Sequence, residues 1–193
     1  MPTPERIARV TQVLSSRQPD LRVVLEEVTN AHNANAVLRT CDAAGVLEVD
    51  VIGSNEAPLP INKAITTRAD KWLRVLYHPT TESCLIDLKA RGFQVAATSL
   101  GPETVPYTAL DYARPTAFVF GNESKGVSPK ALDLADARIR IPMFGMVQSL
   151  NLSVSVGIIL YEAIRQRLAR GLYDAPRLSP AELERYIDEW LDL

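Results

Sequence analysis

The sequence predicts an α/β fold whose mainly parallel sheet is flanked by helices. Two observations lead to this fold class. Short runs that are apolar almost throughout, as in strands buried on both faces, recur along the chain. Between them lie segments of helical character that begin at serine or proline or end at glycine. Strands that alternate with helices in this way form βαβ units, and such units build a parallel sheet.

Six of the apolar runs are predicted to be strands. Each combines β-branched or large apolar residues with a polar or turn-forming boundary. They cover residues 21–28, 48–54, 73–78, 93–100, 116–122 and 137–142. Because most of them are joined by segments long enough to hold a helix, we expect the strands to run parallel.

Three helices between these strands are recognised by their ends. They cover residues 34–44, 81–91 and 129–135. Gly45 and Gly92 follow the first two, and glycine readily adopts the left-handed conformation that ends a helix. Ser128 and Pro129 begin the third, with the serine as cap and the proline at the first helical position.

Two further helices are predicted near the C-terminus. A long helix runs from Leu150 to about Arg170 and stops at Gly171. Its first half is apolar or small on nearly every face, so we expect the sheet and a second subunit to enclose it. The last helix begins at Ser179, where the sequence Ser-Pro-Ala-Glu provides a capping box.

Length and composition predict one domain over residues 1–193, with helical extensions at residues 1–20 and 172–193. The chain is 47% hydrophobic and 23% charged, which suits a soluble protein with a core. Cys41 and Cys84 lack the spacing of a disulfide framework or zinc site, so no metal is predicted. With no long apolar stretch and no signal-peptide pattern, we expect a cytoplasmic protein with no membrane partner.

The distribution of charge is more informative than the net charge of −2. That net charge argues against a protein that coats nucleic acid through overall positive charge. Residues 1–22 and 165–177 are nevertheless locally basic, whereas residues 178–193 are acidic. Each basic segment is either a solvated helix face or a contact surface for an acidic partner.

Several enzyme classes are excluded by missing motifs. The chain contains no Gly-x-Gly-x-x-Gly pattern, which argues against a dinucleotide-binding fold. The segment that starts at Gly121 superficially resembles a phosphate-binding loop, but Val127 stands where the essential lysine is needed. The histidines are His32 and His78, and without Gly-x-Ser-x-Gly they suggest no serine hydrolase.

Three longer segments, in chain order, carry a specific resemblance. They are LEEVTNAHNANAVLRTCDAAGV, AFVFGNESKGVS and IPMFGMVQSLNLSVSVGIILYEA. The first has Asn33 and Arg39 at its characteristic polar positions, the second is a strand that ends in Gly-Asn-Glu, and the third runs from a strand through a loop into a helix. With these segments, over nearly its whole length, the chain resembles the SpoU/TrmH family of knotted RNA methyltransferases.

The resemblance implies a fold and an activity. The fold is of the SPOUT type with a deep C-terminal trefoil knot, a feature that periodicity alone does not suggest. The activity is methyl transfer from S-adenosylmethionine to a ribose 2′-hydroxyl. The likeness is greatest to the branch that modifies a guanosine in the tRNA D-loop. Relatives of this kind build their active site across two chains, so the resemblance also implies a homodimer.

The resemblance further implies roles for particular residues. The catalytic group comprises Asn33, Arg39, Glu123, Ser149 and Asn151. Backbone loops that hold the cofactor include Thr98, Leu100, Gly121, Ile141, Met146 and Leu150. Side chains that contact RNA are Arg9, Arg17, His32, Arg165, Arg167 and Arg177. Glycine at 121 is expected to let adenosine approach the backbone without a Cβ in the way.

Each catalytic candidate also has a plain structural interpretation. Asn33 caps the helix that begins at residue 34, Arg39 pairs with Asp42 three residues on, and Glu123 is a turn residue. Ser149 or Asn151 caps the long helix. Two other functions also remain open: ribose methylation of ribosomal RNA or of another tRNA position, and a non-catalytic RNA-binding module that keeps only the fold.

Overall fold

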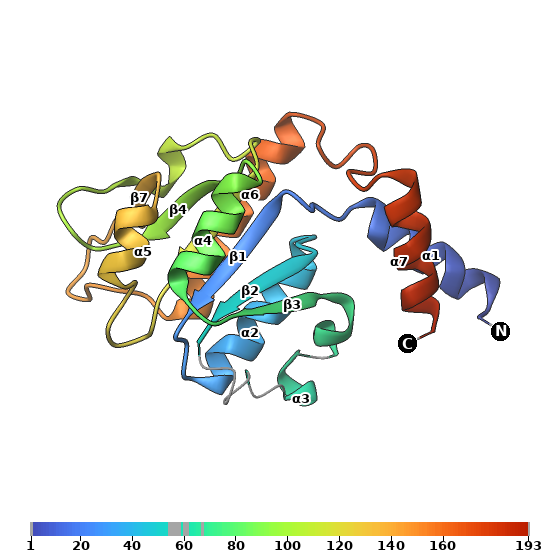
Figure 1. Cartoon of the computed structure of the whole chain (residues 1–193), viewed down its shortest axis with the longest axis horizontal. Coiled ribbons are helices and arrows are strands. Elements are labelled where there is room, and N and C mark those ends of the chain that lie inside the picture. The colour runs from blue at the N-terminus through green and yellow to red at the C-terminus, as the bar shows by residue number, and fades with distance from the viewer. Residues whose placement is uncertain (1, 54–58, 60–61, 67, 193) are drawn as a thin grey trace.

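The computed structural model describes all residues except 1, 54–58, 60–61, 67 and 193. The described residues form a seven-stranded sheet in which every paired strand is parallel (Figure 1). The strands are β1 (Leu21–Glu26), β2 (Glu48–Ile52), β3 (Arg74–His78), β4 (Gln94–Thr98), β5 (Val105–Pro106), β6 (Thr116–Phe120) and β7 (Ala137–Arg140). The predicted α/β class with a mainly parallel sheet is confirmed.

The strand order is β3-β2-β1-β6-β4-β7-β5. All six predicted strands are present, each within the predicted range, although residue 54 of the second lies outside the described residues. The sequence pattern missed β5, which is two residues long and pairs with β7 through Val105 and Ile139. A strand this short contains no alternation from which to recognise it.

The helices are α1 (Pro4–Ser15), α2 (Ala31–Ala43), α3 (Lys63–Thr66), α4 (Thr81–Ala90), α5 (Pro129–Leu134), α6 (Leu152–Ala169) and α7 (Pro180–Leu191). One helix-cap hypothesis needs correction. Asn30, not Asn33, caps α2 by accepting hydrogen bonds from His32 N and Asn33 N, so this helix begins three residues early. Of the two caps expected for the long helix, Asn151 is the residue that caps α6.

Other helix ends agree with the predictions. Gly45, Gly92 and Gly171 have φ values of +78°, +87° and +68°, in the left-handed region that ends a helix at low cost. Ser128 caps α5 through Ala131 N, and Ser179 forms the predicted capping box with Glu182. Local hydrogen bonding therefore sets these boundaries.

Two hydrophobic cores cover the two faces of the sheet. In one, α2 and α6 pack on strand residues such as Val23 and Phe118. The other packs α4 and α5 on Val24, Val119 and their neighbours. Because alternate residues of a strand point to opposite faces, β1 and β6 supply side chains to both cores. These strands are buried on both faces, which explains their continuous apolar character.

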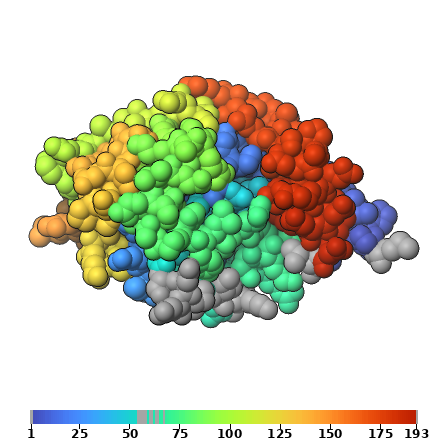
Figure 2. Space-filling model, viewed as in Figure 1, coloured from blue at the N-terminus to red at the C-terminus, as the bar shows by residue number. Residues whose placement is uncertain are grey.

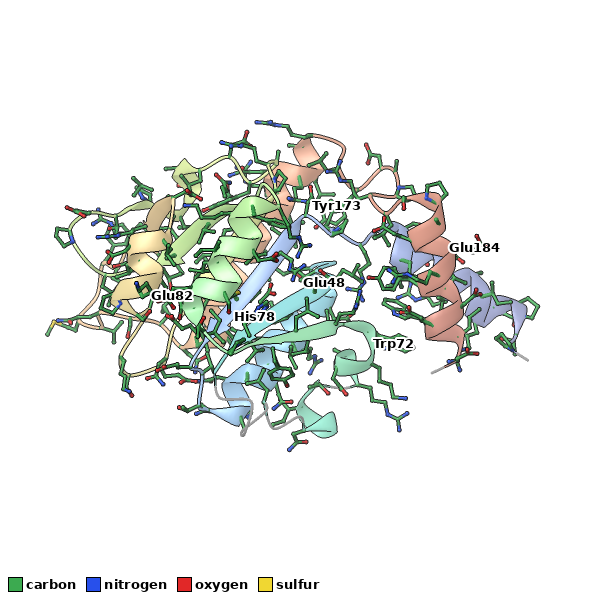
Figure 3. The ribbon with its side chains drawn as sticks, in the orientation of Figure 1. Glu48, Trp72, His78, Glu82, Tyr173 and Glu184 are labelled. Carbon is green, nitrogen blue, oxygen red and sulfur yellow. The ribbon has the colours of Figure 1, made fainter. Side chains whose placement is uncertain are left out.

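A third hydrophobic cluster joins the two ends of the chain. Helices α1 and α7 pack together at the right of Figure 1, with both termini beside them. Leu14, Tyr186 and Trp190 are buried in this cluster, and the Trp190 ring lies 5.1 Å from that of Trp72. The side-chain view places Trp72 next to α7 (Figure 3). No helix among the described residues is long and apolar enough to cross a membrane.

Candidate active site

A cavity of about 570 Å³ opens where β4, β6 and β7 end. The carboxyl ends of parallel strands meet at one edge of a sheet, which is where ligands bind in open α/β folds. Thr98 is the last residue of β4, and Gly121 and Ile141 are the first residues after β6 and β7. The loop before α6 forms the remaining side of the cavity. The volume of the cavity lies within the roughly 300–1,000 Å³ typical of small-molecule sites.

A tight loop from Gly121 to Ser128, here called the motif-two loop, forms much of the cavity wall. Its backbone closes through Gly126 N, which donates to Asn122 O at 2.8 Å. The Asn122 side chain accepts from Ser124 N and Lys125 N and so holds the turn from inside. A Cβ on Gly121 would lie 2.2 Å from the Gly126 backbone. The loop's own backbone therefore already requires glycine at this position, and the close approach of adenosine stays a prediction.

Three predicted catalytic residues form one hydrogen-bonded group. Asn33 Nδ2 donates to Glu123 Oε1 at 3.2 Å, and Asn151 Nδ2 donates to Asn33 Oδ1 at 3.0 Å. Asn33 is buried inside α2, Glu123 belongs to the motif-two loop and Asn151 caps α6. The group thus connects three separate segments at the cavity, and Ser149 also lines it.

Glu123 is held as an anion in this group. Partial burial works to raise the pKa of its carboxyl, but hydrogen bonds outweigh that effect and lower the pKa below its usual range. The donors are its own backbone N–H, the Asn33 side chain and the backbone N–H groups of Thr29 and Asn30. Its plain interpretation as a turn residue is incomplete, because its carboxylate ties the loop to the start of α2.

Five of the six predicted cofactor residues line the cavity: Thr98, Leu100, Gly121, Ile141 and Leu150. Met146 does not, and its side chain is 99% exposed on the loop after β7. Met143 lines the cavity from the same loop instead. Contact of Met146 with the cofactor stays a prediction.

The cavity has two basic lining residues that the sequence analysis did not single out. Lys125 and Arg140 are both exposed, and neither forms an ion pair with any described residue. Lys125 lies within the Gly-Asn-Glu segment that carried the resemblance, so its place in that motif was the available signal. Arg140 ends β7 directly before Ile141, where the third of those segments begins.

Arg39 lies outside the cavity of its own chain. Its side chain is exposed on α2 and makes no hydrogen bond or ion pair with a described residue. Asp42, its supposed surface partner, instead receives a salt bridge from Arg17. The pairing hypothesis for Arg39 is therefore wrong, and its guanidinium is available for a substrate.

Two residues predicted to contact RNA are buried structural arginines, which corrects that prediction. Arg17 is fully buried, donates to Asp42, Val46 O and Trp72 O, and lies 5.1 Å from the Trp190 ring. Arg17 thereby connects α7, through Trp190, to α2 and to the segments around Val46 and Trp72. Arg167 is also fully buried and faces no solvent through which RNA could approach.

The contacts of Arg167 show what it does instead. Its guanidinium donates five hydrogen bonds, at 2.7 to 3.2 Å, to Gln18, Asp20, Tyr112 O and Arg114 O. These partners come from the two connecting segments that lead into the neighbouring strands β1 and β6, so Arg167 holds α6 to both.

The other four RNA-contact candidates are exposed, as that role requires. Arg9 hydrogen bonds to Gln12, and His32 lies on the first turn of α2. Arg165 forms a salt bridge with Glu162, and Arg177 with Asp20. Their contact with RNA stays a prediction.

A buried charged cluster lies on the sheet face between α4 and α7. Figure 2 shows atoms of β1 and β2 between these helices, and Figure 3 places Glu48 and His78 there. Arg22 grips both oxygens of Asp50 at 2.8 and 2.9 Å, and His78 Nε2 lies 2.7 Å from Asp50 Oδ1. Arg22 also pairs with Glu48.

Cys84 brings a third potential metal ligand close to Asp50 and His78, within 4.8 Å. Burial raises the pKa of its thiol, which opposes the thiolate that a metal needs. Arg22 already balances the Asp50 charge, so we assign no metal to this group. Cys41 and Cys84 are both free thiols, as predicted.

Comparisons with known proteins identify the family to which the chain belongs. The SpoU rRNA Methylase family matches residues 20–161, more than half of the chain. The chain therefore belongs to the SpoU methylase family.

Individual proteins to which the chain is similar are enzymes that modify tRNA or rRNA. A tRNA (guanosine(18)-2′-O)-methyltransferase of Thermus thermophilus is 47% identical over 189 residues, covering 98% of this chain and 97% of its own. The crystal structure of the A. aeolicus TrmH/SpoU tRNA modifying enzyme has a TM-score of 0.93 at 44% identity, covering 97% and 95% of the two chains. An AdoMet-bound rRNA methyltransferase from Sinorhizobium meliloti has a TM-score of 0.69 at 30% identity, covering 80% and 59%.

Proposed function

We propose that this protein is a tRNA (guanosine(18)-2′-O)-methyltransferase, which transfers a methyl group from S-adenosylmethionine to the ribose 2′-hydroxyl of a D-loop guanosine. The observation that carries this proposal is 47% identity over nearly both full chains to an enzyme of that name. The hydrogen-bonded group of Asn33, Glu123 and Asn151 beside the cavity supports it, because each of these residues lies in one of the three segments that resemble the family.

The cavity suits S-adenosylmethionine in size and in lining. Its walls combine apolar side chains such as Leu100, Ile141 and Leu150 with strand-end and loop backbone that offers N–H and C=O groups. Those residues would hold the cofactor, which supplies an electrophilic methyl group when bound. The remaining work of the chain is to align the ribose and to manage one proton.

Arg39 is proposed to grip a phosphate of the substrate beside the reacting ribose. A guanidinium is effectively always protonated in a protein, so it is a poor general base. Its positive charge can instead favour ionisation of the 2′-hydroxyl, with the proton leaving late to phosphate or water. Asn33, Glu123, Ser149 and Asn151 would position the ribose and the loops around it.

A homodimer completes this arrangement. Arg39 lies outside the cavity of its own chain, yet α2 packs on α6, where Thr40 approaches Gly157. Val154, Tyr161 and Leu168 follow one another every seven residues along α6, and each is about half exposed. Such an apolar stripe suits a helix of a second copy. We propose that the partner covers it and that Arg39 serves the partner's cavity.

The dimer is tested by placing a charge in this stripe. Tyr161→Glu is expected to give a monomer and to abolish methylation, because a carboxylate opposes burial in an apolar interface. Ile86→Glu on α4 is the control, since Ile86 is also exposed but lies on another helix. Light scattering gives the mass. An active monomer would contradict the proposal.

The proposed reaction is tested with labelled S-adenosylmethionine and unmodified tRNA, followed by mapping of the methylated nucleotide. Arg39→Ala and Arg39→Lys are expected to lose turnover by orders of magnitude and to keep cofactor affinity, with lysine slightly the more active. Wild-type turnover by Arg39→Ala at saturating RNA would refute its role.

The same assay separates the other functions. Methylation of ribosomal RNA or of another tRNA position would replace the guanosine assignment, and RNA binding without methylation would indicate a non-catalytic module. The reaction is also expected to need no metal. Methylation that is lost with EDTA and restored by magnesium, while RNA folding is unchanged, would contradict this expectation. The trefoil knot, the single-domain organisation and a cytoplasmic location stay predictions.

A further inference from the structure

Glu26, the last residue of β1, is a buried carboxylate with an unusual set of partners. Its side chain is 2% exposed. Oε1 accepts hydrogen bonds from Thr81 Oγ1 at 2.6 Å and Ser128 Oγ at 2.7 Å, and Oε2 accepts from Ser128 N at 2.8 Å. No cationic side chain among the described residues forms a salt bridge with it. Burying a carboxylate is costly unless it is fully hydrogen bonded, and these three donors meet that need.

Two of these hydrogen bonds determine where the motif-two loop ends. Ser128 is the last residue of that loop, and its Oγ also accepts from Ala131 N as the cap of α5. One hydroxyl therefore connects the helix to Glu26, while the Ser128 backbone N–H points at the same carboxylate. Glu26 itself does not line the cavity.

The residue after Glu26 holds the other end of the same loop. Asn122 Nδ2 donates to Glu27 O at 2.9 Å. Glu27 has a φ of +50°, in the left-handed region that side chains other than glycine rarely adopt. Strain of this kind persists only where the surroundings impose it. The end of β1 thus grips the loop at Asn122 and at Ser128.

We propose that Glu26 is a positioning residue that holds the motif-two loop in the shape needed to bind the cofactor. This inference rests on the proposed function for the identity of the ligand. The loop supplies the cavity wall from Gly121 to Val127, and Glu26 reaches it only through Ser128.

The third hydrogen bond provides a matched control. Thr81 begins α4, which contributes nothing to the cavity lining. Thr81→Val removes one donor from Glu26 and keeps the shape of the side chain, whereas Ser128→Ala removes a donor on the loop. Because Ser128→Ala also removes the cap of α5, Tm is measured for every variant. A role in general stability predicts that binding falls in step with Tm, whereas a role in loop position predicts that Glu26→Ala and Ser128→Ala weaken binding more than their Tm accounts for and that Thr81→Val does not.

The test measures S-adenosylmethionine binding by calorimetry and amide hydrogen exchange of residues 121–128 in the full chain. Glu26→Ala and Ser128→Ala are expected to weaken binding about tenfold or more, since lost hydrogen bonds of this kind cost that much in an equilibrium constant. Exchange at Gly126 N should rise, because that N–H closes the loop by donating to Asn122 O. Thr81→Val should leave binding and loop exchange near wild type.

Glu26→Gln should lie between wild type and Glu26→Ala. The amide oxygen can face Ser128 N, and the two hydroxyls can rotate to accept from the amide N–H groups. Equal effects of Thr81→Val and Ser128→Ala, or unchanged loop exchange in Glu26→Ala, would overturn the inference. Wild-type protein that fails to bind S-adenosylmethionine would refute the proposed function, and the exchange data would still decide whether Glu26 positions the loop.

Discussion

Replacing Arg167 by alanine is expected to destabilise the fold rather than to weaken RNA contact directly. The guanidinium is fully buried and donates five hydrogen bonds, one of them to the Asp20 carboxylate. Removing one partner of a buried ion pair costs about 3–5 kcal/mol. Arg177 still pairs with Asp20, but Gln18 and the carbonyl oxygens of Asp20, Tyr112 and Arg114 lose their buried donor. In a chain of 193 residues each kcal/mol lowers Tm by roughly 2–4 °C, so Tm should fall by about 6–20 °C.

Arg165→Ala is the matched control for this prediction. It lies two residues away on the same helix, but its side chain is exposed and paired with Glu162. We expect its Tm to stay near wild type and its tRNA affinity to fall, with a smaller dependence of affinity on salt. Thermal unfolding and filter binding at several salt concentrations, below the lower Tm, separate the variants. An Arg167→Ala protein with wild-type Tm and reduced tRNA affinity would refute the structural role.

Two further predictions concern the motif-two loop and acid stability. Gly121→Ala should destabilise the protein by about 1–3 kcal/mol and abolish cofactor binding, because its Cβ would lie 2.2 Å from the Gly126 backbone and force the loop open. Gly101→Ala is the control, since its Cβ would meet only ordinary contact at 3.5 Å; equal effects on binding would contradict the argument. For Asp20, desolvation works to raise the pKa, but hydrogen bonds and charge from Arg167 and Arg177 lower it below the ordinary 3.8. A lowered folded-state pKa contributes stability that is present above about pH 3.8 and lost as pH falls through the folded value. The drop in Tm below pH 4 should therefore be shallower in Asp20→Asn, and an unchanged profile would show that Asp20 does not contribute.

The secondary structure was largely predictable because its signals are local. Gly45, Gly92 and Gly171 end helices through their own backbone conformation. Ser128 and Ser179 each cap the helix that follows them by accepting a hydrogen bond from the backbone N–H three residues on. Continuous apolar runs indicated buried parallel strands for the same reason. The local signals failed where two polar residues competed for one role, as at the start of α2, where Asn30 and not Asn33 is the cap.

The cavity was predictable only as a set of residues. Three segments with a specific resemblance identified Asn33, Glu123 and Asn151, yet their contacts join positions 90 and 118 residues apart. Strand order brings these segments together, because β6 lies between β1 and β4 although it follows both in the chain. No pattern within a few residues records that order.

The sequence by itself determined the fold class and most helix ends, since propensity, periodicity and capping act within a few residues. Its resemblance to a known family indicated the polar residues at the cavity. Tertiary structure alone decided which charged side chains are buried. Arginine is normally exposed, and only long-range packing supplies enough acceptors to bury it. Arg17 and Arg167 are therefore interior supports, whereas Arg39 forms no ion pair with a described residue and its neighbour Asp42 pairs with Arg17.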